Sequence, residues 1–365
     1  MNKSVSSFFA ASYAEAREKF LKAAATAGAE IVDSYAHPAK GPDGGDLSTD
    51  VAWLGPRTAN KLLVLVSSTH GIEGYCGSGC QVSWLENRHY HRDASPDTAA
   101  LLIHAINPYG FAYGRRVNED NVDLNRNFLD FTKPLPTNPD YEALQDKINP
   151  KEWNDNSMAE AERAIANFYG RPNAEFLAKA THFAQHVNPK GTGFGGHGPT
   201  WSNRTFRSIL ANWMQNKSDI CLVDYHTGLG PFGHGDMIYA GQAGEGMARA
   251  WFDHVTPTEE QLKGTDHLAN RLTGMLCQVP PDACPGANIT SGAIEYGTFD
   301  RRSVGKSTRG DVWLHAYGDP SSKQGQEMKA YLREMFFPAS LEWRVMVASR
   351  SNDILRQALT GLRQA

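Results

Sequence analysis

The residues best suited to chemistry are His70 and Glu73, which lie three positions apart just after the strongly apolar residues 62–66. The apolar run predicts a buried strand, and the residues after it predict a turn that brings an imidazole and a carboxylate to one point. Two histidines and one glutamate form the ligand set of many catalytic zinc sites, so this pair needs a second histidine from elsewhere in the chain. Taken alone, a histidine at a strand end is more often a hydrogen-bonded structural residue.

Two other chemically capable side chains also follow or end apolar runs. His226 comes directly after residues 220–225, and Glu295 lies in the apolar run 292–296. The carboxyl ends of parallel strands line the ligand crevice of an open α/β sheet, so these residues can meet the pair at one edge. A carboxylate in an apolar strand costs several kcal/mol unless it is paired or faces a cleft, which favours a functional place for Glu295.

The elements that must position these residues follow from the alternation of apolar and polar segments. We expect helices at 10–27, 76–86, 204–216 and 244–254, a helical pattern over 157–187 that is broken near residues 170–172, and two more helices after 323. We expect strands at 29–35, 51–54, 61–68, 101–106, 220–225 and 292–296, and a basic loop at 304–307. Strand, helix and strand between 61 and 106 indicate a parallel crossover. We predict an α/β fold with a mixed, largely parallel central sheet flanked by helices. Residues 1–365 form a single domain in this prediction, with 129–203 as a loop and helix insertion at the rim of the cleft.

The composition excludes several classes of protein. A hydrophobic fraction of 41% and a charged fraction of 21% are typical of a globular chain with a sizeable core. The formal net charge of −4 gives no general attraction to nucleic acid or anionic membranes, so we expect neither as a partner. No segment approaches the ~20 apolar residues of a membrane span, and the apolar part of the N-terminus is too short for a secretory signal. Reduced thiols in a cytoplasmic protein best explain the five cysteines.

The polar segment between Glu73 and His226 contains the most specific sequence motif of the chain. Residues 107–110 read Asn-Pro-Tyr-Gly, residues 122–128 read Val-Asp-Leu-Asn-Arg-Asn-Phe, and Arg116 stands nine residues before Asn125. The order His-x-x-Glu, Asn-Pro-x-Gly, Val-Asp-x-Asn-Arg-Asn, His, Glu across about residues 60–300 resembles that of carboxypeptidase-A-like zinc metallopeptidases. The sequence Asp-x-His-Thr-Gly around His226 is also similar to the related succinylglutamate desuccinylase and aspartoacylase branch.

The resemblance implies a zinc-carboxypeptidase-like fold and one Zn²⁺ ion held by His70, Glu73 and His226. Glu295 would act as the general base toward the attacking water. Arg116 would stabilise the oxyanion of the tetrahedral intermediate, although its neighbour Arg115 is an alternative by position.

Further roles follow from the same resemblance. Asn125 and Arg126 would bind a substrate carboxylate, and Asp123 would orient His70 by accepting its other ring N–H. The tyrosine that donates a proton in this family has no clear counterpart here, and Tyr239 and Tyr296 are the candidates.

Three functions remain open on the sequence. The first is a zinc-dependent carboxypeptidase that cleaves a peptide or amide bond next to a free carboxylate, and the second is a deacylase of N-acyl amino acids with the same mechanism. The third is a binding protein without turnover, which would need neither Glu295 nor Arg116. Small peptides or acyl amino acids are therefore the expected substrates. No pattern specifies an oligomeric state, and a donor set of nitrogen and oxygen also accepts divalent metals other than zinc.

Overall fold

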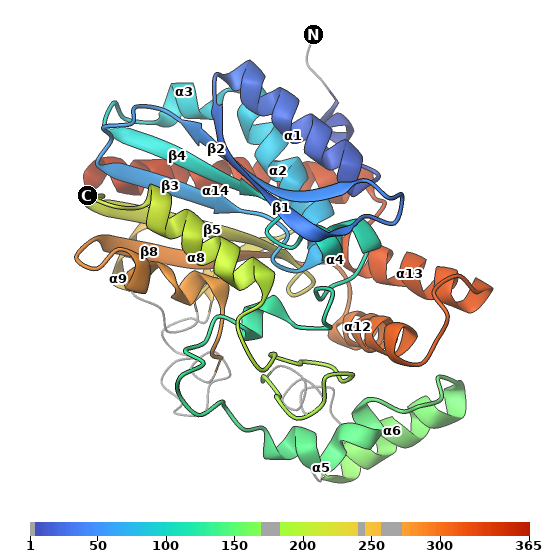
Figure 1. The fold of residues 1–365 in the computed structure, drawn as a ribbon. Helices are drawn as coiled ribbons and strands as arrows, with labels where there is room; N and C mark the ends of the chain where they lie inside the picture. The colour runs from blue at the N-terminus through green and yellow to red at the C-terminus, as the bar shows by residue number, and fades with distance from the viewer. Residues whose placement is uncertain (1–3, 169–182, 240–244, 257–271) are drawn as a thin grey trace.

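One mixed sheet organises the computed structural model, which describes residues 4–168, 183–239, 245–256 and 272–365 (Figure 1). Within this part of the chain the sheet has eight strands in the order β1-β2-β4-β3-β5-β8-β6-β7. The neighbours β4, β3, β5 and β8 run parallel, whereas β1, β2 and β6 join antiparallel. The predicted mixed, largely parallel sheet is confirmed. The strands are β1 Glu30–Lys40, β2 Asp46–Leu54, β3 Lys61–Val66, β4 Thr98–His104, β5 Asp219–Thr227, β6 Gly235–Ile238, β7 Val255–Thr256 and β8 Asn288–Tyr296.

Helices cover both faces of this sheet because its central strands are apolar on both sides. On β3, Leu63 and Leu65 pack into one apolar core with α1, α2 and α14, while Leu62 and Val64 pack into a second core with α8. Successive strand residues point to opposite faces, so one run of leucine and valine serves both cores. The helices are α1 Tyr13–Ala27, α2 Gly74–Glu86, α3 His89–Asp93, α4 Pro108–Tyr113, α5 Pro139–Ile148, α6 Asp155–Phe168, α8 Trp201–Trp213, α9 Glu245–Trp251, α11 Pro280–Ala283, α12 Arg301–Ala316, α13 Lys323–Phe336 and α14 Leu341–Gln364.

The predicted crossover between 61 and 106 is confirmed as β3, α2 and β4, and it sets the position of Glu73. Helix α2 is buried along almost its whole length and begins one residue after Glu73. A Cβ added at Gly77 would lie 2.9 Å from the Cβ atoms of both Ser67 and Tyr225. The helix backbone therefore packs directly against the ends of β3 and β5, which only a residue without a side chain allows.

Two predicted elements differ from the structure. Residues 304–307 belong to α12 rather than to a loop, because Asp300 caps this helix by accepting hydrogen bonds from the backbone N–H groups of Arg302 and Ser303. The helical pattern expected over 157–187, with its break near residues 170–172, corresponds to α6 up to Phe168; residues 169–182 lie outside the described part, and 183–187 are not helical. No helix in the described ranges combines the length and apolar character needed to cross a membrane.

The buried His104 at the end of β4 gives the fold a testable pH dependence. Its ring stacks on Phe20 of α1 with centroids 4.5 Å apart, its Nε2 lies 2.9 Å from Ser78 Oγ, and burial lowers its pKa to about 4. Because the unfolded chain binds this proton below pH ~6.5 and the folded protein does not, the free energy of unfolding falls as pH drops from ~6.5 to ~4. We expect this histidine to account for about 3 kcal/mol of that fall.

The measurement is urea unfolding at several pH values for the wild type and for His104→Gln, whose side chain does not titrate. The variant should lose less stability than the wild type between pH 6.5 and 4. Parallel pH profiles for the two proteins would contradict the role of His104.

Candidate active site

The turn that carries His70 lies against helix α4 and the turn at Arg115 and Arg116 that follows this helix. Backbone N–H groups of Gly71 and Ile72 donate to the carbonyl oxygens of Arg116 and Arg115 over 3.0 and 2.8 Å. A Cβ added at Gly71 would lie only 2.1 Å from the backbone carbon of Gly110. The His70 turn therefore touches the backbone of α4 and of the turn after it, and this contact fixes the position of His70 relative to the polar segment that follows α4.

Strand register brings the remaining residues to the same place. Strand β5 lies beside β3, with Asp224 opposite Val66, and β8 lies beside β5, with Glu295 opposite His226. Since these three strands are parallel neighbours, their carboxyl ends share one edge of the sheet. The sequence expectation that His70, Glu73, His226 and Glu295 meet there agrees with their placement.

His70, Glu73 and His226 form a tight, buried cluster of potential metal ligands. His70 Nδ1 lies 2.9 Å from Glu73 Oε1, His226 Nδ1 lies 2.9 Å from Glu73 Oε2, and the two Nδ1 atoms are 3.2 Å apart. Zn²⁺ with bonds of about 2.0–2.1 Å at tetrahedral angles separates its ligand atoms by about 3.3 Å. These separations fit a divalent metal ion of that size.

Two aspartates fix the orientation of the imidazoles. His70 Nε2 lies 3.1 Å from Asp123 Oδ1, and His226 Nε2 lies 2.7 Å from Asp224 Oδ2. A carboxylate only accepts hydrogen bonds, so each Nε2 carries a proton, and each Nδ1 can then present a lone pair to the cluster. Once the Nδ1 atoms are deprotonated, their lone pairs and the Glu73 carboxylate converge on one point, which is the arrangement that a cation satisfies.

The charges of the cluster reinforce one another. Burial raises the pKa of Glu73, but the charges and hydrogen bonds of His70 and His226 lower it overall to about 2. Burial disfavours the charged form of His226, yet the adjacent Asp224 and Glu73 raise its pKa well above the ordinary value. A carboxylate that stays ionised beside two imidazoles is suited to hold a positive charge.

Asp224 is the residue of this cluster to which the sequence patterns assigned no role. It also accepts a 2.7 Å hydrogen bond from Thr69 Oγ1, which links the two strand ends. The available signal was its spacing from His226, because residues two apart on a strand point to the same side.

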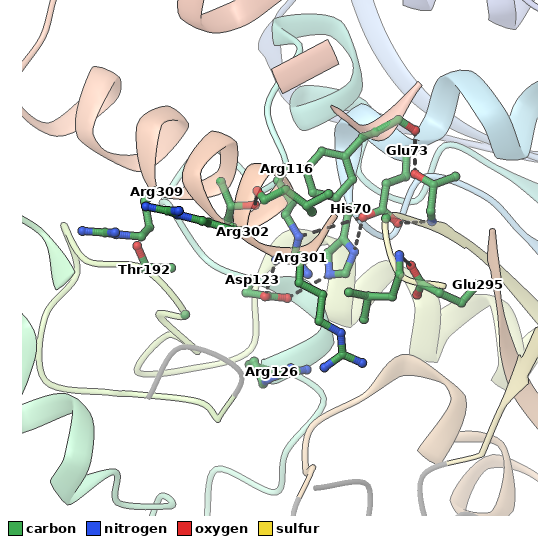
Figure 2. Close-up of a pocket in the computed structure, with 18 residues that line it drawn as sticks. His70, Glu73, Arg116, Asp123, Arg126, Thr192, Glu295, Arg301, Arg302 and Arg309 are labelled. Carbon is green, nitrogen blue, oxygen red and sulfur yellow. Dashed lines mark hydrogen bonds and ion pairs between the residues drawn. The ribbon is translucent and has the colours of Figure 1, made fainter. Parts of the chain in front are cut away.

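Glu295 lies half-buried at the end of β8 and faces the pocket (Figure 2). Its Oε1 accepts a 3.0 Å hydrogen bond from the backbone N–H of Leu229. Burial, followed by the negative charge of Glu73, raises the pKa of Glu295 to about 7. A carboxylate with a pKa near the working pH can both accept and return a proton, as a general base must.

Arg116, rather than Arg115, reaches the cluster. Arg116 Nη1 lies 2.5 Å from Asp123 Oδ2, and its Nε lies 3.9 Å from Glu73 Oε1. Arg115 points away, with its Nε 3.6 Å from Asp311 Oδ1. Asp123 therefore contacts both His70 and Arg116 and holds the two side chains in one arrangement.

The two residues expected to bind a carboxylate have different environments. Arg126 lines the pocket, donates to the carbonyl oxygen of Asn125 over 2.6 Å, and has a pKa lowered by burial. The Asn125 amide instead lies 3.3 Å from His226 Nε2 and accepts from the backbone N–H of Leu276 over 3.0 Å. The structure thus brings Arg126 to the pocket, whereas the Asn125 side chain contacts His226 and the backbone of Leu276.

Neither candidate tyrosine lies in the pocket. Tyr239 and Tyr296 are buried in the apolar core beside α2 and α14, and no tyrosine lines the pocket among the described residues. Tyr296 follows Glu295 on β8, so the alternation of a strand turns it to the opposite face.

The chain matches the family model described as protein of unknown function (DUF2817) over residues 9–350. It belongs to this family. No curated protein matches the chain by sequence.

Several solved structures are similar to the chain at low identity. Carboxypeptidase A from Helicoverpa armigera is 14% identical with a TM-score of 0.45, over 91% of this chain and 76% of that one. Bovine thrombin-activatable fibrinolysis inhibitor, in complex with tick carboxypeptidase inhibitor, is 10% identical with a TM-score of 0.49, over 98% of each chain. The murein-tripeptide amidase MpaA from Escherichia coli O157 is 14% identical with a TM-score of 0.32, over 82% of this chain and 97% of that one.

The contact between the two turns predicts the effect of Gly71→Ala. Because the added methyl group overlaps the backbone of Gly110, the turn must shift, and we expect a loss of about 1–3 kcal/mol in the free energy of unfolding together with weaker metal binding. Urea unfolding and metal analysis of the purified protein measure both effects. Gly246→Ala in α9 is the control, since an added Cβ there meets no atom within 4 Å. Equal stability and metal content in the two variants would contradict this account.

Asp224→Asn tests the orientation of His226. We expect the affinity for zinc to fall about 10- to 100-fold, because the amide no longer enforces the ring orientation and basicity that the carboxylate provides. Competition with a chromophoric chelator measures the affinity. Asp219→Asn, a buried aspartate at the opposite end of β5, is the matched control and should bind zinc as the wild type does. An unchanged affinity in Asp224→Asn would remove this aspartate from the site.

Proposed function

We propose that this protein is a zinc-dependent hydrolase that cleaves a peptide or amide bond next to a free carboxylate. The convergence of His70, Glu73 and His226 beside Glu295 carries the proposal. A metal cluster alone would suit a structural site, but a neighbouring half-buried carboxylate with a pKa raised to about 7 supplies the proton acceptor that hydrolysis needs.

His70, Glu73 and His226 are the residues that would hold the ion, with Asp123 and Asp224 behind the two histidines. When bound, zinc supplies Lewis-acid chemistry that acidifies water and polarises a carbonyl group. Two histidines and one glutamate with a fourth position left for water are the ligand set of catalytic zinc sites, which makes zinc our first choice among divalent ions.

Glu295 and Arg116 are the side chains that transfer the proton and stabilise the developing negative charge. Glu295 accepts a proton from the attacking water and returns it to the leaving amine, because its carboxylate lines the pocket and lies opposite His226 in the β5–β8 register. Arg116 donates to the oxygen that becomes negative as the carbonyl is attacked, a contribution of about 3–4 kcal/mol in comparable sites. Its ion pair with Asp123 holds the guanidinium beside the metal ligands before substrate arrives.

Arg126 binds the free carboxylate of the substrate. It lies in the same pocket as Glu295 and Arg116, and its guanidinium is buried, so an anion there interacts in a medium of low dielectric constant. Thr192 and Gly193, from the segment 129–203 that we assign to the rim, also line this pocket. Their position favours small peptides or acyl amino acids over folded proteins.

A cytoplasmic location accompanies this proposal. All five cysteines are buried and none forms a disulfide, including Cys76 and Cys80 on α2. Free thiols persist in a reducing compartment, where small peptides and acyl amino acids are also available as substrates.

Glu295→Gln tests the function directly. We expect zinc content equal to that of the wild type, because Glu295 is not a ligand, and a fall in kcat of about 10²- to 10⁴-fold, because the proton acceptor is lost. Elemental analysis and hydrolysis of blocked dipeptides and N-acyl amino acids give the two readouts. Glu327→Gln on the exposed surface of α13 is the matched control. Full activity in Glu295→Gln would refute the assigned role.

A further inference from the structure

Arginines outnumber acids around the pocket. Five arginines line it, whereas the acidic residues that line it are Glu73, Asp123 and Glu295. Glu73 and Asp123 are occupied by the two histidines and by Arg116, and a bound metal ion would add further positive charge. A single substrate carboxylate leaves this pocket strongly positive. The five arginines are Arg116, Arg126, Arg301, Arg302 and Arg309.

Two of these arginines on α12 already have partners at the rim of the pocket. Arg302 Nη2 donates to Glu162 Oε2 of α6 over 2.6 Å. Arg309 is buried and donates from Nε to the carbonyl oxygen of Ile148 at the end of α5 over 2.8 Å. These contacts hold α12 against α5 and α6, and within the described residues no carboxylate forms an ion pair with Arg309.

Arg301, the first residue of α12, differs from both. Its side chain is exposed and makes no ion pair or hydrogen bond with any residue in the described part of the chain. The adjacent Asp300 does not neutralise it, because that carboxylate accepts hydrogen bonds from the backbone N–H groups of Arg302 and Ser303 and from Ser303 Oγ. Figure 2 shows the Arg301 side chain reaching across the pocket toward the side where Arg126 lies.

The helix leaves open space beside Arg301. Residues 301, 305 and 308 share one face of α12 by their spacing, and all three line the pocket. Gly305 has no side chain, and a Cβ added there would meet no atom within 4 Å. A substrate group can therefore lie along this face with the Arg301 guanidinium next to it.

We propose that Arg301 forms a second anion-binding subsite, which takes a carboxylate other than the one held by Arg126. This inference rests on the proposed function and names its substrate class, a small peptide or acyl amino acid with two carboxylates. The guanidinium can grip a carboxylate through two parallel hydrogen bonds, and the buried Arg309 on the same helix adds positive potential. The second carboxylate belongs either to the side chain of the released amino acid or to the acyl group.

A binding experiment tests the subsite without turnover. Glutarate and butyrate, which carry two carboxylates and one, are titrated calorimetrically into the zinc-loaded wild type, Arg301→Gln and Arg356→Gln. Arg356 is an exposed arginine paired with Asp353 on α14, so its variant controls for the change in net charge. We expect the wild type and Arg356→Gln to bind glutarate about 10- to 100-fold more tightly than butyrate, and Arg301→Gln to lose this preference.

Hydrolysis of matched substrates then identifies where the second carboxylate lies. Blocked dipeptides ending in glutamate or glutamine test the released amino acid, and N-succinyl- and N-butanoyl-phenylalanine test the acyl group. In one of the two pairs, kcat/KM of the wild type should favour the charged member about 10- to 100-fold, and Arg301→Gln should bring the ratio near one. The rate on the neutral member should change about twofold or less.

The outcomes separate the subsite from the function. Hydrolysis of charged and neutral substrates at equal rates, with equal binding of glutarate and butyrate, overturns the subsite and leaves the hydrolase intact. A glutarate preference that depends on Arg301, without hydrolysis of any substrate, supports the subsite and overturns the proposed function. A preference that persists in Arg301→Gln overturns the role of this arginine.

Discussion

The site depends on the convergence of three electron-pair donors in a buried space. Two imidazole nitrogens and the Glu73 carboxylate lie 2.9–3.2 Å from one another. Without a metal ion, a proton must lie between these donors, and Asp224 and Glu73 accordingly raise the pKa of His226 well above its ordinary value. Asp123 and Asp224 make the convergence more pronounced, since they accept from the outer ring nitrogens and so turn the inner ones toward each other. Negative charge is thereby concentrated at one end of the pocket.

Such a crowded arrangement requires a rigid framework, which the parallel strands and two close backbone contacts provide. The β5–β8 register sets His226 opposite Glu295, and the β3–β5 pairing fixes the neighbouring turn. Gly71 lets the His70 turn approach the backbone of Gly110, and Gly77 lets α2 approach the ends of β3 and β5. Any other residue at these two positions would keep the segments farther apart. The glycines around His70 and Glu73 are therefore packing requirements of the candidate site as much as turn formers.

The strands that end at the candidate site residues could be predicted from the sequence better than the other segments that line the pocket. His70, His226 and Glu295 could be placed because the carboxyl ends of apolar parallel strands gather at one edge of the sheet, where polar side chains can face a ligand. The prediction of a loop at 304–307 was wrong, although Asp300 with its two acceptor oxygens is a recognisable cap for helix α12. The Asn125 contacts could not be predicted, because they join segments about 100 and 150 residues apart that only the folded chain brings together.

The pocket is electrostatically divided, and this division orients a substrate. Carboxylates surround the metal cluster at the strand ends, while α12 and Arg126 supply guanidinium groups along the remaining wall. In the function that we propose, an anionic substrate is attracted to these arginines, which leaves its neutral amide nearest to the histidine cluster and Glu295. Two anchored carboxylates would fix the scissile bond more firmly than one, because the second contact removes rotation about the first. Selectivity for dianionic substrates and correct positioning of the reacting carbonyl would then have the same physical origin.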